Sequence, residues 1–158
     1  MCWRRMPATK AQALVQGLVI QDAGPAADAE ALERLALWML QRFAPIVAAD
    51  PPDGIVIDSS GADHLHGGET AMLARLVEKL AGVGLWASAA IADTWGAAHA
   101  LARSEARPAC ISTPGDAIAD VSPLPIVALR LPPAMVDGLR VLEFDRVGEL
   151  LAHRRAFV

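Results

Sequence analysis

Two short apolar runs separated by turn residues constrain the fold of this 158-residue chain more than any other feature. "IVAAD" (residues 46–50) and "GIVID" (residues 54–58) are rich in β-branched side chains, and Pro51, Pro52 and Asp53 stand between them. Apolar runs joined by such residues predict an antiparallel β-hairpin. An isolated hairpin is only marginally stable in water, so other elements must cover its apolar face.

Helical periodicity supplies that cover. Apolar side chains recur at intervals of three and four residues over 32–43 and over 72–80, which predicts a helix on each side of the hairpin in sequence. Shorter patterns predict further elements, namely helices over 7–15 and 94–104 and strands over 18–22, 85–93 and 109–113.

This order of elements predicts an α+β fold with a mostly antiparallel sheet and helices on one face. Trp38 and Trp86 are expected in or near the core, and Trp95 at the surface. Residues 114–133 are rich in proline, and a subdomain boundary is expected within them. The tail that follows predicts two short helices joined by a tight turn near residues 143–145.

Composition narrows the functional classes. The formal net charge is −4, which argues against nucleic-acid binding through bulk charge, because phosphate contacts need Lys and Arg. The two cysteines, Cys2 and Cys110, form no CxxC pair, as expected of a reduced, cytoplasmic protein. No apolar run approaches the roughly 18 residues typical of a membrane-spanning helix, so no membrane partner is expected.

Carboxylates around the hairpin are the first candidate site. Asp50, Asp53 and Asp58 are the residue type that two-metal nucleotidyl transfer needs, with ions held about 4 Å apart. Asp is also common in turns for conformational reasons alone, and the residues by themselves favour that structural role. His64 and His66 have the spacing of an HxH zinc pair, but no further ligands follow at regular spacing, so metal binding is disfavoured.

Three separated blocks carry a resemblance to a known family. They are the "DPPDG…D…G…HL.GGE" pattern over 50–69, "GLWASAAIADTWGAAHALAR" over 84–103 and "SPLPIVALRLPPAMVDGLRVLEFDRVGELLA" over 122–152. In this order they resemble the Y-family (UmuC-like) translesion DNA polymerases, and most of all the bacterial ImuB branch.

The resemblance implies a division of the chain. Residues 1–16 resemble the remnant of a finger-to-palm helix, residues 17–121 a palm-like α+β domain with a palm-type sheet, and residues 122–158 a thumb-like helix-hairpin-helix subdomain. The first palm strand, most of the fingers and the little finger are not recognised in the sequence. Because that strand is central in the family's palm, its neighbours are expected to expose unpaired edges and to favour self-association.

The resemblance also implies that the catalytic site is lost. Asp53 falls on the family's metal-binding Asp, as a vestigial ligand, and Gly54 falls on its catalytic Glu, so no catalytic residue is expected. Asp58, Gly61, Gly67 and Gly68 are expected to be structural turn residues.

Two further positions depart from the family pattern. Trp95 falls where active relatives hold the triphosphate with a Lys. Leu131, Pro132 and Pro133 replace the thumb's Gly-x-Gly turn, and proline has no N–H to offer a DNA phosphate. Arg146, Arg154 and Arg155 make the only locally basic region, for which two readings stay open: a contact with the DNA backbone or a solvated helix end.

The expected function is therefore accessory. The resemblance implies a non-catalytic scaffold in DNA repair, the SOS response to DNA damage, mutagenesis and translesion synthesis, with weak DNA binding. It implies three partners: an error-prone DNA polymerase, the sliding clamp and a RecA-like, ImuA-type protein. No cofactor is expected. The first alternative is an active, Mg²⁺-dependent DNA-directed DNA polymerase whose N-terminal strand lies outside this sequence, and the second is an interaction module without a DNA role.

Overall fold

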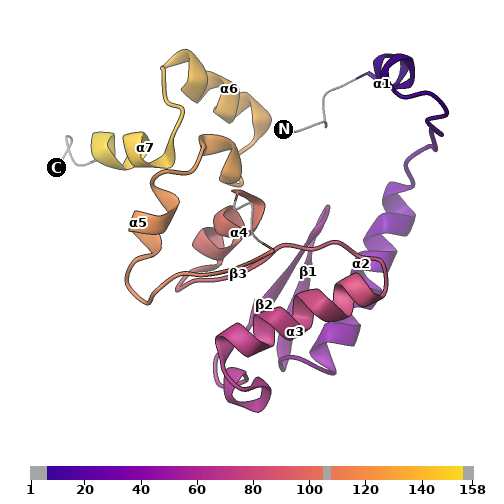
Figure 1. Cartoon of the computed structure of the whole chain (residues 1–158). Coiled ribbons are helices and arrows are strands. Elements are labelled where there is room, and N and C mark those ends of the chain that lie inside the picture. Colours follow the sequence, from indigo (N-terminus) through magenta and orange to yellow (C-terminus); the bar gives the residue numbers. More distant parts are fainter. Residues whose placement is uncertain (1–6, 105–107, 155–158) are drawn as a thin grey trace.

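The computed structural model describes residues 7–104 and 108–154. Figure 1 shows helix α1 (Ala8–Leu14) standing apart, linked by an extended segment to the long helix α2 (Pro25–Leu40). Pro25 occupies the start of α2, where its missing N–H leaves no hydrogen bond unmade, and Asp28 lies in the first turn near the positive end of the helix dipole.

The predicted hairpin is confirmed. β1 (Ile46–Asp50) pairs antiparallel with β2 (Gly54–Asp58), with Ile46 opposite Asp58 and Asp50 opposite Gly54. A cis peptide joins Pro51 to Pro52 in the turn. The turn therefore places the Asp50 carboxylate next to the backbone of Gly54.

A short loop leads from the hairpin to the second long helix. It contains a 3-10 turn, η2 (Asp63–His66), and then Gly67 and Gly68, whose φ angles of 86° and 96° are accessible to glycine at no steric cost. Helix α3 (Glu69–Gly82) follows. One apolar core joins α2, the loop after it and α3 to the hairpin; its buried members are Met39, Phe43, Ala44, Ala62, Met72, Leu76 and Leu80, with Val47, Ile55 and Ile57 packed against them.

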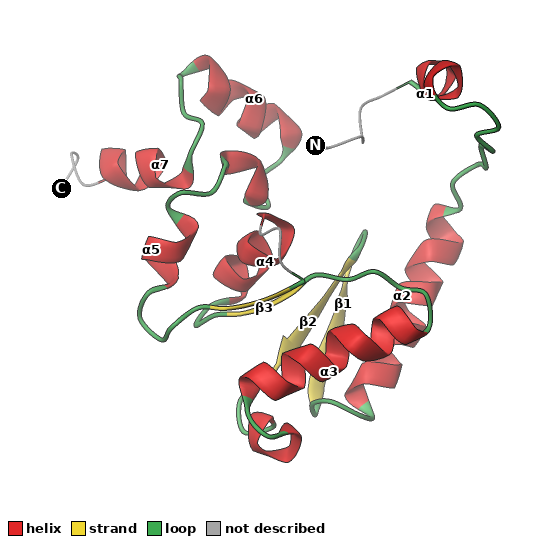
Figure 2. Ribbon diagram, viewed as in Figure 1, coloured by secondary structure: helices red, strands yellow, loops and turns green. Residues whose placement is uncertain are grey.

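The second half of the chain is built around helix α4 (Trp95–Ser104). α4 connects β3 (Ala89–Ile91) to β4 (Ala109–Ile111), and these two strands pair in parallel. Among the described residues the strands form two separate two-stranded sheets, β1–β2 and β3–β4. Figure 2 shows the two sheets side by side between the helices.

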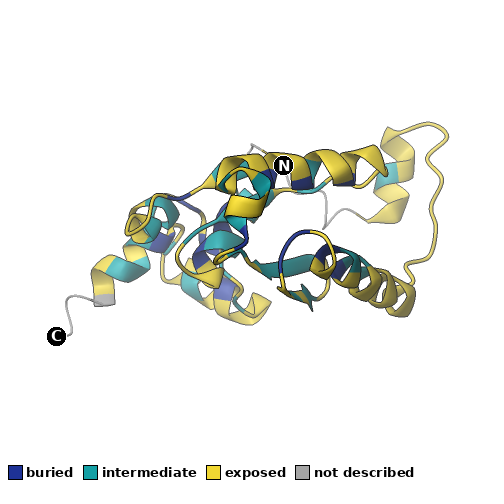
Figure 3. Ribbon diagram, turned by 90° about the horizontal axis from the view of Figure 1, so that it is seen from below, coloured by how far each residue is buried: buried dark blue, intermediate teal, exposed yellow. Residues whose placement is uncertain are grey.

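Four short helical elements complete the described chain. They are α5 (Ala117–Val121), the 3-10 turn η3 (Ile126–Ala128), α6 (Pro133–Val141) and α7 (Val147–Arg154). A second apolar core joins α5, η3 and α7 to α4; its buried members are Ala100, Leu101, Leu124, Ala128 and Val147, with Val121 and Leu151 packed against them. Figure 3 colours the ribbon by burial and shows dark blue, buried stretches along helices that are otherwise largely exposed. The second core crosses the predicted boundary between residues 121 and 122, and the division into domains stays a prediction.

The α+β fold class is confirmed, with the antiparallel hairpin the longer of the two strand pairs. Two local expectations are wrong. Residues 18–22 form no strand, because no described segment lies beside them to share backbone hydrogen bonds, and Val19 is 78% exposed. Trp86 is not in the core but 95% exposed; it lies in the loop between the end of α3 and the start of β3 at Ala89. Trp95 is 50% exposed, as expected.

Candidate functional site: the hairpin turn and its arginines

Two of the predicted carboxylates, Asp50 and Asp53, lie where the hairpin turn meets α4 and the segment before α6, whereas Asp58 lies at the other end of β2, opposite Ile46. A cleft of about 1160 Å³ runs along this region, lined by the hairpin, α3, β3 and α4. Asp50, Asp53 and Asp58 all line the cleft, but only Asp50 and Asp53 lie together at the turn. Their partners decide what chemistry they can do.

Asp53 is paired with an arginine on α4. The Arg103 guanidinium donates to the Asp53 carboxylate, and both side chains are about one-third exposed. The Arg103 Nε–H donates to His99 Nε2 over 3.0 Å, one turn earlier on the helix. Burial first, and the charge of Arg103 second, lower the pKa of His99. The imidazole is therefore neutral near pH 7, which leaves Nε2 free to accept.

Asp50 is paired with a second arginine from the C-terminal half. Arg130 donates through one guanidinium nitrogen to the Asp50 carboxylate and through the other to the Pro51 carbonyl oxygen over 2.9 Å. The same guanidinium lies over the indole ring of Trp95, 5.2 Å from its centroid, in cation–π geometry. One face of the Trp95 ring is therefore covered by a cation of the chain itself.

Gly54 leaves little room for the side chain that a catalytic glutamate would need. A Cβ placed there would lie 3.0 Å from the Asp50 carbonyl oxygen and 3.3 Å from Asp50 Oδ2. The close approach follows from the register, since Asp50 and Gly54 are the last pair before the turn. Glycine at this position therefore fits the observed turn sterically, besides lacking a metal-binding group.

Asp58 and Asp93 are used locally. The Ser60 N–H donates to Asp58 Oδ1 over 2.9 Å, and hydrogen bonding to Ser60 lowers the pKa of Asp58. The Gly115 N–H donates to Asp93 Oδ2 over 2.6 Å. Both carboxylates hold the backbone of turns, as Asp commonly does.

These residues do not fit a two-metal centre. Within 7–104 and 108–154, no three His, Cys, Asp or Glu side chains converge as a metal site would require. The two hairpin-turn carboxylates face guanidinium groups, which keep their charge at any ordinary pH. A divalent cation there would meet like charge on both sides.

His66 has a structural environment rather than that of a zinc ligand. Its Nε2 is hydrogen-bonded to the Phe43 carbonyl oxygen at 2.9 Å, and its ring stacks on Phe43 with centroids 5.4 Å apart. Because η2 is a 3-10 turn and not a strand, His64 and His66 do not share the face that the HxH reading needed.

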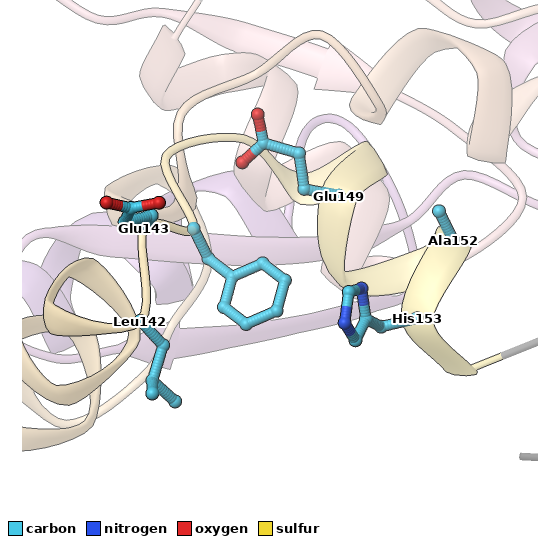
Figure 4. A pocket seen from close by; sticks show the side chains of 6 residues that line it. Leu142, Glu143, Glu149, Ala152 and His153 are labelled. Atoms are coloured by element: carbon cyan, nitrogen blue, oxygen red, sulfur yellow. The ribbon is translucent and has the colours of Figure 1, made fainter. Parts of the chain in front are cut away.

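The C-terminal helical pair presents more acidic than basic groups at its turn. Figure 4 shows the pocket there, lined by Leu142, Glu143, Phe144, Glu149, Ala152 and His153. Arg146 is exposed and donates to the Pro123 carbonyl oxygen over 2.5 Å. The Arg154 side chain and all of Arg155 lie outside the described residues, so a DNA contact through these arginines stays a prediction.

Glu149 fixes the start of α7. Its Oε2 accepts from the backbone N–H groups of Asp145 (2.7 Å) and Arg146 (2.9 Å), as in the second half of a capping box. These hydrogen bonds lower the pKa of Glu149, that from Arg146 most. Glu143 adopts the left-handed φ of 62° at the end of α6, which is unusual for a residue with a side chain.

Sequence reasoning missed Arg103, Arg130 and His99, which determine the state of the site. Arg103 and Arg130 follow their partners by 50 and 80 residues, and no local pattern links positions so far apart. The exposed aromatic Trp95 was the one signal in the sequence that pointed to this place.

Comparison with known proteins confirms the resemblance. The chain is 51% identical over 149 residues to Protein ImuB of Caulobacter vibrioides strain NA1000 / CB15N, and equally to that of strain ATCC 19089 / CIP 103742 / CB 15. The match covers 94% of this chain and 32% of each relative, so the chain spans about a third of the length of the curated relatives it matches. No protein-family model and no solved structure matches it. None of the described helices has the length and hydropathy needed to cross a membrane.

Proposed function

We propose that this chain, a Y-family polymerase-like relative of ImuB in the mutagenesis pathway, acts as a non-catalytic scaffold during error-prone translesion synthesis. The observation that carries the proposal is the pairing of both hairpin-turn carboxylates with arginines, beside a glycine at the family's catalytic Glu position. A polymerase palm needs carboxylates free to hold metal ions, and these are engaged with guanidinium groups.

The scaffold would work in the cytoplasm through protein partners and weak DNA contact. The partners proposed are those that the resemblance implies: an error-prone DNA polymerase, the sliding clamp and a RecA-like, ImuA-type protein. The net charge of −4 supports weak rather than tight DNA binding, since each phosphate contact needs a cation from the protein. No resident cofactor is proposed.

Nucleotide incorporation on a primed template tests the proposal. The chain is incubated with Mg²⁺, and separately with Mn²⁺, beside an active Y-family polymerase as positive control. We expect no primer extension above a no-protein blank. Extension by the natural chain that Asp53→Ala abolishes would establish the active nucleotidyltransferase instead, because Asp53 falls on the family's metal-binding position.

DNA binding is measured separately, by fluorescence anisotropy of a labelled primer–template at low salt. Weak binding that declines steeply with added salt is the expected result, because phosphate contacts release counter-ions. No binding even at the lowest salt would favour the interaction module without a DNA role.

A further inference from the structure

We propose that Arg103 and Arg130 are fixed counter-ions of the hairpin turn, and that together they clasp the β1–β2 turn to α4 and to the segment preceding α6. The inference rests on the proposed non-catalytic function, because in an active polymerase the two carboxylates would bind divalent cations and not arginines. Nothing in the relatives' names describes such a clasp.

Three distant parts of the chain meet in the clasp. Asp50 and Asp53 flank the Pro51–Pro52 turn, Arg103 lies in the last turn of α4, and Arg130 lies between η3 and α6. The two ion pairs bridge 50 and 80 residues of sequence. The hairpin belongs to the first apolar core and α4 to the second, so the clasp joins elements that are otherwise packed in separate clusters.

Burial shows why Asp50 needs its partner, whereas Asp53 is about one-third exposed. The Asp50 side chain is only 13% exposed, and a carboxylate so far removed from water must be paired or lose its charge. Arginine provides a cation that cannot deprotonate and a planar fork of donors. Arg130 uses two nitrogens of that fork: the Asp50 carboxylate accepts from one and the Pro51 carbonyl oxygen from the other.

Two side chains of α4, Trp95 and His99, contact the two arginines. The Trp95 ring supports the Arg130 guanidinium from one face, and His99 accepts from Arg103. Trp95 and His99 are themselves in ring contact, with centroids 6.1 Å apart, so the two arginines share one backing on α4. An aromatic residue at position 95 therefore has a role in the clasp that a lysine could not fill, because a second cation beside Arg130 would repel it.

A double-mutant cycle on the whole chain tests the clasp. Asp50→Asn, Arg130→Gln and the double variant are compared by urea unfolding, with Arg34→Gln as matched control. Arg34 pairs with Glu30 on the exposed surface of α2, where the two side chains are 63% and 73% exposed. We expect each clasp variant to lower the folding equilibrium constant about fivefold or more, the double variant to fall no further than the worse single, and Arg34→Gln to change it less than twofold.

Hydrogen exchange gives a readout that remains if a variant unfolds too easily for denaturation curves. In Arg130→Gln, amides of residues 53–57 and of α4 should exchange about fivefold faster, while those of α3 keep their natural rates. Additive effects in the cycle, or exchange in Arg130→Gln indistinguishable from that in Arg34→Gln, would overturn the clasp. Neither measurement involves DNA or nucleotide, so the two failures are told apart: loss of the clasp would remove the structural support of the scaffold proposal, whereas only primer extension would show catalysis and overturn the scaffold itself.

Discussion

Substituting Gly54 tests whether the hairpin turn has room for the glutamate that active relatives carry. Two opposing effects set the free-energy change for Gly54→Ala. The new Cβ would lie 3.0 Å from the Asp50 carbonyl oxygen and 3.3 Å from Asp50 Oδ2, so strand β1 or the carboxylate must shift. Asp50 cannot shift freely, because Arg130 and the strand register hold it. Forced overpacking of this kind costs about 1–2 kcal/mol.

The second effect acts on the unfolded chain. Replacing glycine by alanine reduces the entropy of the unfolded state and stabilises the fold by about 0.4–1 kcal/mol where the backbone permits it. Gly54 has no left-handed φ, so this gain applies. The difference between the two effects is a net destabilisation of Gly54→Ala of up to about 1.6 kcal/mol. Gly54→Glu should be destabilised further, because it adds a negative charge beside Asp50 and Asp53.

Gly138→Ala is the matched control. Gly138 lies exposed inside α6, and a Cβ there would meet no atom within 4 Å. Alanine should stabilise that helix by about 0.5–1 kcal/mol. The assay is urea unfolding of the three variants beside the natural chain. If Gly54→Ala stabilised as much as Gly138→Ala, the close contact with Asp50 would have no energetic consequence and the steric argument would fail.

Two other predictions follow from the C-terminal half. Leu101→Ala should destabilise the chain by about 3–5 kcal/mol, because Leu101 is 2% exposed in the core joining α4 to η3 and α7. The control Leu37→Ala, at a 57% exposed site on α2, should change stability by less than about 1 kcal/mol in the same denaturation assay. Glu149→Gln should lower the melting temperature at pH 7. Hydrogen bonds from the backbone N–H groups of Arg146 and Asp145 depress the folded-state pKa of Glu149, so its contribution to stability is present above the unfolded-state pKa and is lost as pH falls through the folded-state pKa. Equal melting temperatures of the two proteins at pH 7 would refute this role.

Most helices and the hairpin could be predicted from the sequence, because apolar spacing and turn residues within each segment determine them. The hairpin, α2 and α3 were found from alternation, turn residues and helical spacing. The hairpin and α3 begin and end near their expected residues, whereas α2 begins at Pro25, seven residues before the apolar periodicity over 32–43. The strand predicted over 18–22 failed for the complementary reason. Its β-branched residues favour extended backbone, but a strand exists only with a partner, and partners are set by the whole fold.

The candidate site was predicted in part for the same reason. The sequence identified Asp50, Asp53 and Gly54, since their chemistry and their turn are local. Whether those carboxylates hold metal ions depends on Arg103 and Arg130, which only the tertiary fold brings to them. The sequence contains other arginines that could pair with these carboxylates equally well on paper. Which arginines do so follows from the packing of the fold and not from spacing in the sequence.

The two sheets and the cleft between them bear on how such a chain would associate. β2 pairs only with β1 and β3 only with β4 among the described residues, so each presents an edge without a strand partner there. Both strands line the cleft, together with apolar side chains of α3 and the exposed Trp86. Unpaired strand edges beside apolar surface are favourable places for another extended segment to pair. The exposed Trp86 and the unpaired edges of β2 and β3 therefore lie along the same cleft, whose turn end carries the two arginine–aspartate pairs.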